Sequence, residues 1–228
     1  LFRSALIEAA ALPDNFDASR PSVRICVTGQ EHHRENIRVE QEQSRIAEPL
    51  ILQTDSSTML CGDSGSPGEP VIYWQTNMAG SGIDQLSVTI DLRQAGPCGH
   101  NAPGILVEQD KQGGRGHLSL TNSTITGSSG YALSTKGSPT KIDIDLINTH
   151  IVNCRGAAVF TSGALFMKSS EIVGCHLQPF DESEASALVE STEDYGLQIQ
   201  STVFFGNLVD GEHLPKDQEV ALLRGPLE

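Results

Sequence analysis

Eight residues, Ile144-Asp-Leu-Ile-Asn-Thr-His-Ile151, carry the pattern that decides the fold. Apolar residues stand at the first, third and eighth positions, and a small polar residue stands at the fifth. The same pattern recurs in Leu118–Ile125, Leu165–Ile172 and Leu197–Phe204. Alternating apolar residues predict a β-strand, and Asn or Ser at the fifth position predicts a corner, because these residues tolerate a left-handed backbone. The four stretches are therefore predicted to be equivalent strands.

A second short element follows each of these strands and sets the period of the repeat. Its copies are Ala132-Leu133, Ala158-Val159, Ala187-Leu188 and Ala221-Leu222, with Ile105-Leu106 and Val71-Ile72 earlier in the chain. The copies are about 26 to 34 residues apart, a period typical of solenoids. One turn cannot bury its apolar face alone, so turns stack with strands about 4.7–4.9 Å apart. We therefore expect a parallel β-solenoid.

Stacking predicts columns of like residues in the core. One column is Leu120, Leu146, Met167 and Ile199, and a second is Ile125, Ile151, Ile172 and Phe204. Small turns are expected after these strands, at Gly127, Cys154, Cys175 and Gly206. Cys154 and Cys175 share a column, either as stacked small core residues or as a disulfide between turns. The sequence leaves both alternatives open.

The first twenty residues differ from the repeat. Leu1 to Leu12 predicts a helix that Ser4 can cap and Pro13 ends. Such a helix would cover an exposed sheet edge at one end of the solenoid. We expect residues 1–20 to form this capping helix and a loop, and residues 21–228 to form one β-helix domain of about six turns.

The charge balance excludes several partners. Fifteen Lys and Arg stand against 29 Asp and Glu, for a net charge of −14. Nucleic acids and anionic membranes require a basic patch, which the sequence lacks. No apolar stretch is long enough to span a bilayer, so membrane insertion is not expected. The five cysteines form no CxxC pair and the seven histidines are scattered, which predicts no metal site and no cofactor; Ca²⁺ is the ion that an acidic surface can hold.

Two short motifs carry a resemblance to a known superfamily. Thr202-Val-Phe-Phe-Gly-Asn207 resembles the Phe-x-x-Asn element of polymorphic membrane proteins and autotransporter passengers. Gly156-Ala-Ala-Val159 resembles their Gly-Gly-Ala-aliphatic element, with the second Gly replaced. Over roughly Gln85 to Pro226 the repeat resembles the right-handed parallel β-helix (pectin-lyase-like) superfamily. The resemblance implies an all-β, single-stranded right-handed parallel β-helix that is secreted, at the cell surface or in the periplasm of a bacterial envelope.

Enzymes of that superfamily direct attention to acidic residues on an outer face. They use clustered carboxylates with a basic residue, or paired aspartates, as acid and base. The candidates here are Asp143 and Asp145, which point the same way on one strand, and Lys168, expected one turn above Asp145. A solvated sheet face with one ion pair is the simpler interpretation. If the chain is an enzyme, these residues predict a polysaccharide lyase or glycoside hydrolase that acts on an acidic polysaccharide.

Aromatic residues offer a second kind of site. Tyr73, Val107, Ser134, Phe160, Val189 and Leu223 are predicted to share one column, facing either solvent or the core. An outward column would be an apolar stripe for a saccharide or a protein. The candidate ligand-binding residues are Tyr73, Trp74, Phe160 and Phe166.

One local motif points to a different chemistry. Cys61-Gly-Asp-Ser-Gly-Ser-Pro67 resembles the nucleophile motif of chymotrypsin-like serine proteases, with Ser64 as the nucleophile. That family needs a His and an Asp earlier in the chain, on two β-barrels. Too little sequence precedes Ser64 for those barrels, so a glycine-rich turn is the simpler interpretation. The function we expect is a non-catalytic, adhesin-like module that presents one face to a saccharide or protein partner.

Overall fold

The computed structural model describes the central and C-terminal strands in most detail. The described residues are 23–27, 32–34, 37–39, 50–54, 59–61, 69–76, 86–88, 104–109, 115–128, 131–136, 141–177, 188–191, 196–209, 212–213 and 223–224. All regular structure in these ranges is β-strand, and none of it is helix. The helix predicted over Leu1 to Leu12 lies outside them. Within these same ranges, no helix could cross a lipid bilayer.

Three parallel sheets account for most of the strands. The five-stranded sheet contains β7 (Leu86–Val88), β9 (Arg115–Thr121), β12 (Lys141–Ile147), β15 (Leu165–Lys168) and β19 (Leu197–Gln200). The four-stranded sheet contains β10 (Thr124–Thr126), β13 (His150–Val152), β16 (Glu171–Val173) and β20 (Val203–Phe205). The seven-stranded sheet contains β3 (Ile37–Val39), β6 (Ile72–Thr76), β8 (Ile105–Gln109), β11 (Leu133–Lys136), β14 (Val159–Thr161), β18 (Val189–Ser191) and β23 (Leu223–Arg224).

Smaller sheets lie at the two ends of the described chain. β1 (Val23–Val27) pairs with β4 (Leu50–Thr54), and β2 (His32–Arg34) pairs with β5 (Met59–Cys61), both in parallel. The third small sheet contains β17 (His176–Leu177), β21 (Leu208–Val209) and β22 (Glu212–His213). The β21–β22 pair is antiparallel, and all other pairs of described strands are parallel.

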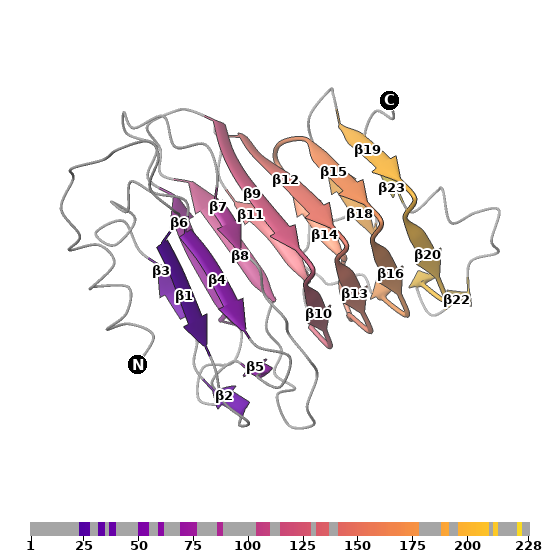
Figure 1. Cartoon of the computed structure of the whole chain (residues 1–228). Coiled ribbons are helices and arrows are strands. Elements are labelled where there is room, and N and C mark those ends of the chain that lie inside the picture. The colour runs from indigo at the N-terminus through magenta and orange to yellow at the C-terminus, as the bar shows by residue number, and fades with distance from the viewer. Residues whose placement is uncertain are drawn as a thin grey trace.

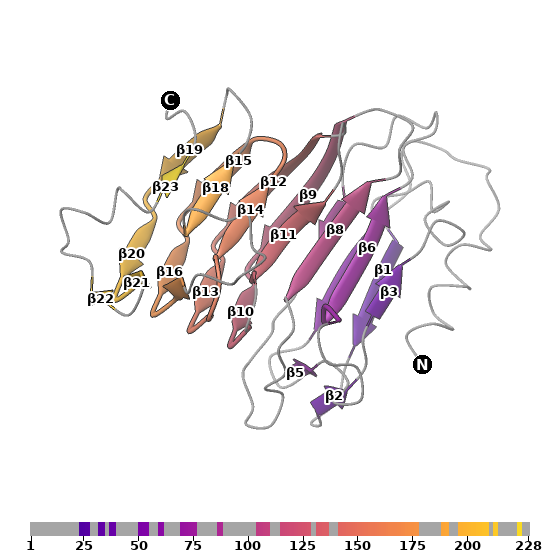
Figure 2. The same ribbon diagram turned by 180° about the vertical axis from the view of Figure 1, so that it is seen from behind.

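The chain visits the three large sheets in a fixed order. β11, β12 and β13 lie in the seven-, five- and four-stranded sheets in turn, and β14, β15 and β16 repeat that order, as do β18, β19 and β20. We call each such set a rung. Figure 1 looks onto the five- and four-stranded sheets, where successive rungs lie side by side, and Figure 2 looks onto the seven-stranded sheet behind them. An all-β architecture with parallel sheets agrees with the sequence prediction.

The predicted core columns are confirmed residue by residue. Leu146 lies opposite Leu120 and Met167, and Met167 lies opposite Ile199. The second column, Ile125, Ile151, Ile172 and Phe204, is also in register. Most of these side chains are completely buried, and each such burial stabilises the fold by about 1.5–3 kcal/mol. The apolar columns therefore fix the register of the stack.

Left-handed residues make the corners of each rung. Positive φ angles occur at the fifth position of all four repeats, at Asn122, Asn148, Ser169 and Ser201. Asn148 Nδ2 donates to Asn122 Oδ1 at 2.7 Å, so the corner amides also stack. A second corner follows the four-stranded sheet, with positive φ at Gly127, Asn153, Gly174 and Gly206. The predicted turns are confirmed, although Cys154 and Cys175 lie one position after the left-handed residue.

The predicted aromatic column is half wrong. Tyr73, Ser134 and Phe160 do share a column on the face opposite the core, but its other members are Arg38, Leu106, Glu190 and Arg224. Ser134 and Glu190 are buried in that column. Val107 and Val189 belong to inward columns and are completely buried, and Leu223 lies opposite Val189. At these strands the predicted alignment with the neighbouring strands was wrong by one residue. A shift of one residue moves a side chain to the opposite face of the sheet.

Candidate functional site

The three predicted catalytic residues lie on the outer face of the five-stranded sheet. Along β12, burial alternates so that Ile142, Ile144 and Leu146 face the core. Asp143 and Asp145 are half-buried on the opposite face, as predicted from their spacing. Lys168 ends β15 and is exposed.

The predicted pairing of Lys168 directly above Asp145 is wrong. Asp145 lies between Ser119 on β9 and Phe166 on β15, and Phe166 in turn lies opposite Gln198 on β19. Lys168 lies opposite Ile147, so it is a diagonal neighbour of Asp145. The buried Leu146–Met167 pair sets this register. Once these two residues lie opposite each other, the residues before and after them on the two strands must also lie opposite each other.

Asp143 is engaged by the backbone of the next rung. Its Oδ1 accepts a hydrogen bond from the Ala164 amide at 2.8 Å. The chain approaches so closely here that a Cβ on Gly163 would lie 2.5 Å from the Ile142 carbonyl and 2.6 Å from Asp143 Oδ1. Asp143 thus holds the turn that leads into β15.

Buried hydroxyl groups surround the same turn. Thr161 Oγ1 donates to the Ile142 carbonyl at 2.6 Å, and Ser191 Oγ donates to the Gly163 carbonyl at 2.9 Å. Thr135 Oγ1 accepts from the Ser162 amide at 2.8 Å. These bonds satisfy backbone groups that would otherwise be buried without partners. The turn beneath Asp143 is therefore rigidly held.

The column that contains Asp145 combines several kinds of side chain. Ser119, Asp145 and Phe166 are half-buried, while Gln198 is exposed. A hydroxyl, a carboxylate, an aromatic ring and an amide therefore follow one another across four strands. We call Ser119, Asp145, Phe166 and Gln198 the mixed column; Lys168 and Gln200 flank it in the next outward column.

Three of the predicted ligand-binding aromatics, Tyr73, Trp74 and Phe160, lie on a different sheet from Phe166. Tyr73 and Phe160 share an outward column of the seven-stranded sheet. The guanidinium of Arg38 lies 4.8 Å from the centre of the Tyr73 ring, and Tyr73 Oη donates to Glu108 Oε2 at 2.6 Å. Tyr73 is thus held on two sides by charged neighbours.

Phe160 packs against another aromatic ring. Its ring centre lies 5.7 Å from that of Tyr131, with the planes tilted by 46°, a common geometry for aromatic pairs. Trp74 lies on β6 of the same sheet, opposite Val39 and Val107 in the strand register. The structure therefore places Tyr73 and Phe160 on one sheet and Phe166 on another, where Phe166 shares the outer face with Asp145 and Lys168.

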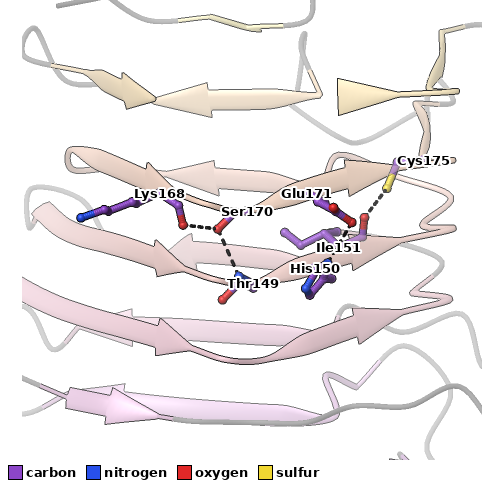
Figure 3. A network of polar contacts seen from close by, with 7 residues as sticks. All are labelled: Thr149, His150, Ile151, Lys168, Ser170, Glu171 and Cys175. Atoms are coloured by element: carbon purple, nitrogen blue, oxygen red, sulfur yellow. Dashed lines mark hydrogen bonds and ion pairs between the residues drawn. The ribbon is translucent and has the colours of Figure 1, made fainter. Parts of the chain in front are cut away.

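A column of hydroxyl groups at the corners was missed from the sequence. Ser123, Thr149, Ser170 and Thr202 occupy the sixth position of the four repeats, and each hydroxyl donates to the carbonyl two residues earlier. Ser170 Oγ also accepts from the Thr149 amide at 3.1 Å, which links two rungs (Figure 3). The sequence contains the pattern that would have predicted this column, because all four repeats have Ser or Thr at the sixth position.

One histidine is paired on the outer face of the four-stranded sheet. His150 Nδ1 lies 3.0 Å from Glu171 Oε2, with both side chains partly exposed. Figure 3 shows the side chain of Lys168 directed away from this pair. Over the described ranges, no group of three His, Cys, Asp or Glu side chains is placed to hold a metal ion.

Cys154 and Cys175 are stacked free thiols, so the first of the two alternatives from the sequence is correct. Both are buried, and Cys175 Sγ lies 3.8 Å from the Ile151 carbonyl (Figure 3). The hydrogen bond to Cys154 and burial together raise the pKa of Cys175 far above its ordinary value. The same hydrogen bond lowers the pKa of Cys154, against the effect of its burial. Cys175, which keeps its proton, is unreactive.

Asn207, from the Phe-x-x-Asn element, completes the same corner. Its Oδ1 accepts from the Cys175 amide at 2.9 Å, and its Nδ2 donates to the Ile172 carbonyl at 3.0 Å. Both bonds are buried, so this element has a structural role in the present chain.

Ser64 and most of the protease-like motif lie outside the described residues, and of that motif only Cys61 is described, at the end of β5. No protein-family model, curated protein or solved structure matches this chain.

Proposed function

We propose that the chain is a right-handed parallel β-helix that acts as a non-catalytic binding module, secreted or on a bacterial cell envelope. We further propose that it binds a neutral saccharide along the mixed column. The fold part of this proposal is supported by the fixed order in which the chain visits three parallel sheets and by the continuous core columns.

The mixed column is the observation that carries the functional part. Ligand sites combine an apolar or aromatic surface with a few polar groups that set orientation. Phe166 provides the aromatic surface, and Asp145 and Gln198 stand on either side of it in register. Carboxylate and amide groups are hydrogen-bonding partners suited to sugar hydroxyls.

The spacing of the column favours an elongated ligand. Neighbouring strands lie about 4.8 Å apart, so the four side chains extend over about 14 Å. A linear oligosaccharide laid across the strands would meet them in succession, whereas a small compact ligand would contact one or two.

Charge decides which saccharides fit. The chain carries a net charge of −14, which repels polyanions at long range. A neutral saccharide avoids this repulsion. The hydrogen bond between Asp143 and the Ala164 amide also engages the carboxylate that an acid–base mechanism would need.

The test is retention on a panel of insoluble and immobilised neutral polysaccharides. We expect wild-type protein to bind at least one, and Phe166→Ala to reduce affinity by about tenfold, or about 1.4 kcal/mol. Phe160→Ala is the matched control, because it removes the same ring from the other sheet. Loss of binding in Phe160→Ala with retention in Phe166→Ala would place the site on the seven-stranded sheet instead.

The same assay, extended to acidic polysaccharides, tests for catalysis. A polysaccharide lyase or hydrolase would release soluble sugar, and Asp145→Asn would abolish that release. Turnover of this kind, of an acidic polysaccharide above all, would replace the binding proposal with the enzymatic one.

A further inference from the structure

Cys154 and Cys175 occupy equivalent positions on neighbouring rungs. Each stands two residues after a paired valine, because Val152 on β13 lies opposite Val173 on β16. The His176 amide donates to the Cys154 carbonyl at 2.6 Å, so the two rungs remain hydrogen-bonded where the cysteines lie. Neighbouring strands are about 4.8 Å apart. The backbones of the two cysteines are therefore side by side.

The two sulfur atoms also meet. Cys175 Sγ lies 3.8 Å from the carbonyl of Val173 on its own rung and 3.8 Å from that of Ile151 on the rung of Cys154 (Figure 3). The thiols of Cys154 and Cys175 are hydrogen-bonded to each other. Their exposed fractions are 1% and 0%. The pair thus shares one buried site between two rungs.

This arrangement meets the geometric requirement for a disulfide. Bridged cysteines have Cα atoms about 4.4–6.8 Å apart, a range that includes the spacing of neighbouring strands. Because the sulfur atoms are already in contact, a bond between them requires rotation of the side chains and no separation of the rungs. The structure describes both as free thiols, which is the reduced form of the pair.

We propose that Cys154 and Cys175 form a disulfide that links two neighbouring rungs when the chain folds under oxidising conditions. Disulfides form and persist in secreted proteins and in the bacterial periplasm, so the location proposed above supplies such conditions. The disulfide itself is independent of the ligand that the module binds.

Thiol–disulfide exchange supplies the chemistry, with a small-molecule disulfide such as glutathione disulfide as the oxidant. The thiolate of one cysteine attacks a sulfur of the oxidant, whose S–S bond breaks, and one glutathione thiolate leaves. The second cysteine then loses its proton and attacks the sulfur of the first, which releases the second glutathione. The products are one protein disulfide and two glutathione thiols, which carry the two cysteine protons. The exchange takes place during folding, because the completed corner buries both sulfur atoms.

The link would stabilise the part of the stack that carries the mixed column. Cys154 follows β12 and β13, and Cys175 follows β15 and β16. These are the rungs that present Asp145 and Phe166 on neighbouring strands. A disulfide restricts the unfolded chain by closing a loop. We expect the oxidised protein to melt about 5–10 °C above the reduced protein.

Peptide mapping tests the link directly. The full chain is refolded from urea with glutathione disulfide, blocked with iodoacetamide, digested with trypsin and analysed by mass spectrometry without reduction. Cleavage after Arg155 and Lys168 places the two cysteines in separate peptides, residues 142–155 and 169–216. We expect these peptides to be joined, and to separate when dithiothreitol is added. Recovery of both as alkylated thiols, or joined to Cys26, Cys61 or Cys98, would overturn the proposal.

A variant without the pair provides the control for stability. In the double variant Cys154→Ala, Cys175→Ala, refolding with glutathione disulfide should leave the melting temperature unchanged. An equal rise in this variant and in the wild-type protein would assign the effect to other cysteines and would overturn the proposal. If the variant does not fold, the peptide map of the wild-type chain still decides. Neither measurement uses a saccharide, so a failure here is distinguishable from a failure of the proposed binding.

Discussion

At the scale of single residues, Cys175 makes stability depend on pH. Its pKa is raised in the folded state, whereas an unfolded cysteine titrates near about 8.5. Below about pH 8.5 both states keep the proton and stability is unaffected; above it, the unfolded state loses the proton first. The free energy of unfolding should therefore fall by about 1.4 kcal/mol per pH unit for this one group.

Urea unfolding between pH 7 and pH 10 measures this dependence. Because Cys175 also lowers the pKa of Cys154, the two thiols are removed together: the double variant Cys154→Ala, Cys175→Ala should be less stable at pH 7 and should show a shallower decline above pH 8.5, by about one proton. Parallel declines in the wild-type protein and the double variant would mean that the pair of thiols releases its protons as readily in the folded state as in the unfolded state.

Asn207 is expected to be the most sensitive of the corner asparagines. Its buried side chain satisfies the Cys175 amide and the Ile172 carbonyl. Asn207→Ala leaves both backbone groups without those bonds and should lower the free energy of unfolding by about 2–4 kcal/mol. Asn148→Gly is the matched control, because Asn148 is exposed and glycine accepts its positive φ; it should cost about 0.5–1 kcal/mol. Equal losses in chemical denaturation would contradict this assignment.

At the scale of elements, alanine substitutions in two glycine-containing turns, at Gly163 and Gly206, should lower the free energy of unfolding by different amounts. At Gly163 a Cβ would collide with backbone, whereas at Gly206 it would meet nothing within 4 Å and only the positive φ is unfavourable. We expect Gly163→Ala to cost about 3 kcal/mol or more and Gly206→Ala about 1 kcal/mol. Thermal unfolding of the two variants compares them directly, and a reversed order would mean that the turn into β15 relaxes easily.

The register between neighbouring strands could be predicted where inward and outward residues alternate clearly along each strand. In β12 and β15, Leu146 and Met167 are each flanked by outward residues, so the alternation identified the core column correctly. In Ala187-Leu-Val189 and Ala221-Leu-Leu223, consecutive apolar residues gave no alternation. The predicted column therefore slipped by one residue there, and Val189 was grouped with Phe160 although it lies opposite Val159 and on the other face of the sheet.

The outward pairs were harder to predict than the core. Like residues stack in the core because they share one apolar environment, but outward neighbours need not resemble one another. Asp145 was consequently matched with Lys168, although the column places it beside Phe166. The candidate residues on this face were correctly assigned to one side of β12, and their partners across the strands were not.

At the scale of the whole molecule, the stacked rungs turn a sequence repeat into a row of evenly spaced side chains. The mixed column crosses four strands of the five-stranded sheet, and Figure 1 shows those strands side by side. A saccharide that follows this row would gain contacts with each added sugar unit until it spans the column. Its affinity should then stop rising.

Calorimetric titration with a length series of the neutral oligosaccharide that the wild-type protein retains measures this dependence most directly. We predict that affinity rises with length up to a span of about 14 Å and then becomes constant, and that Phe166→Ala weakens the long oligomers about tenfold while Phe160→Ala does not. A monosaccharide that binds as tightly as the longest oligomer, or an unchanged affinity in Phe166→Ala, would contradict the proposed binding face.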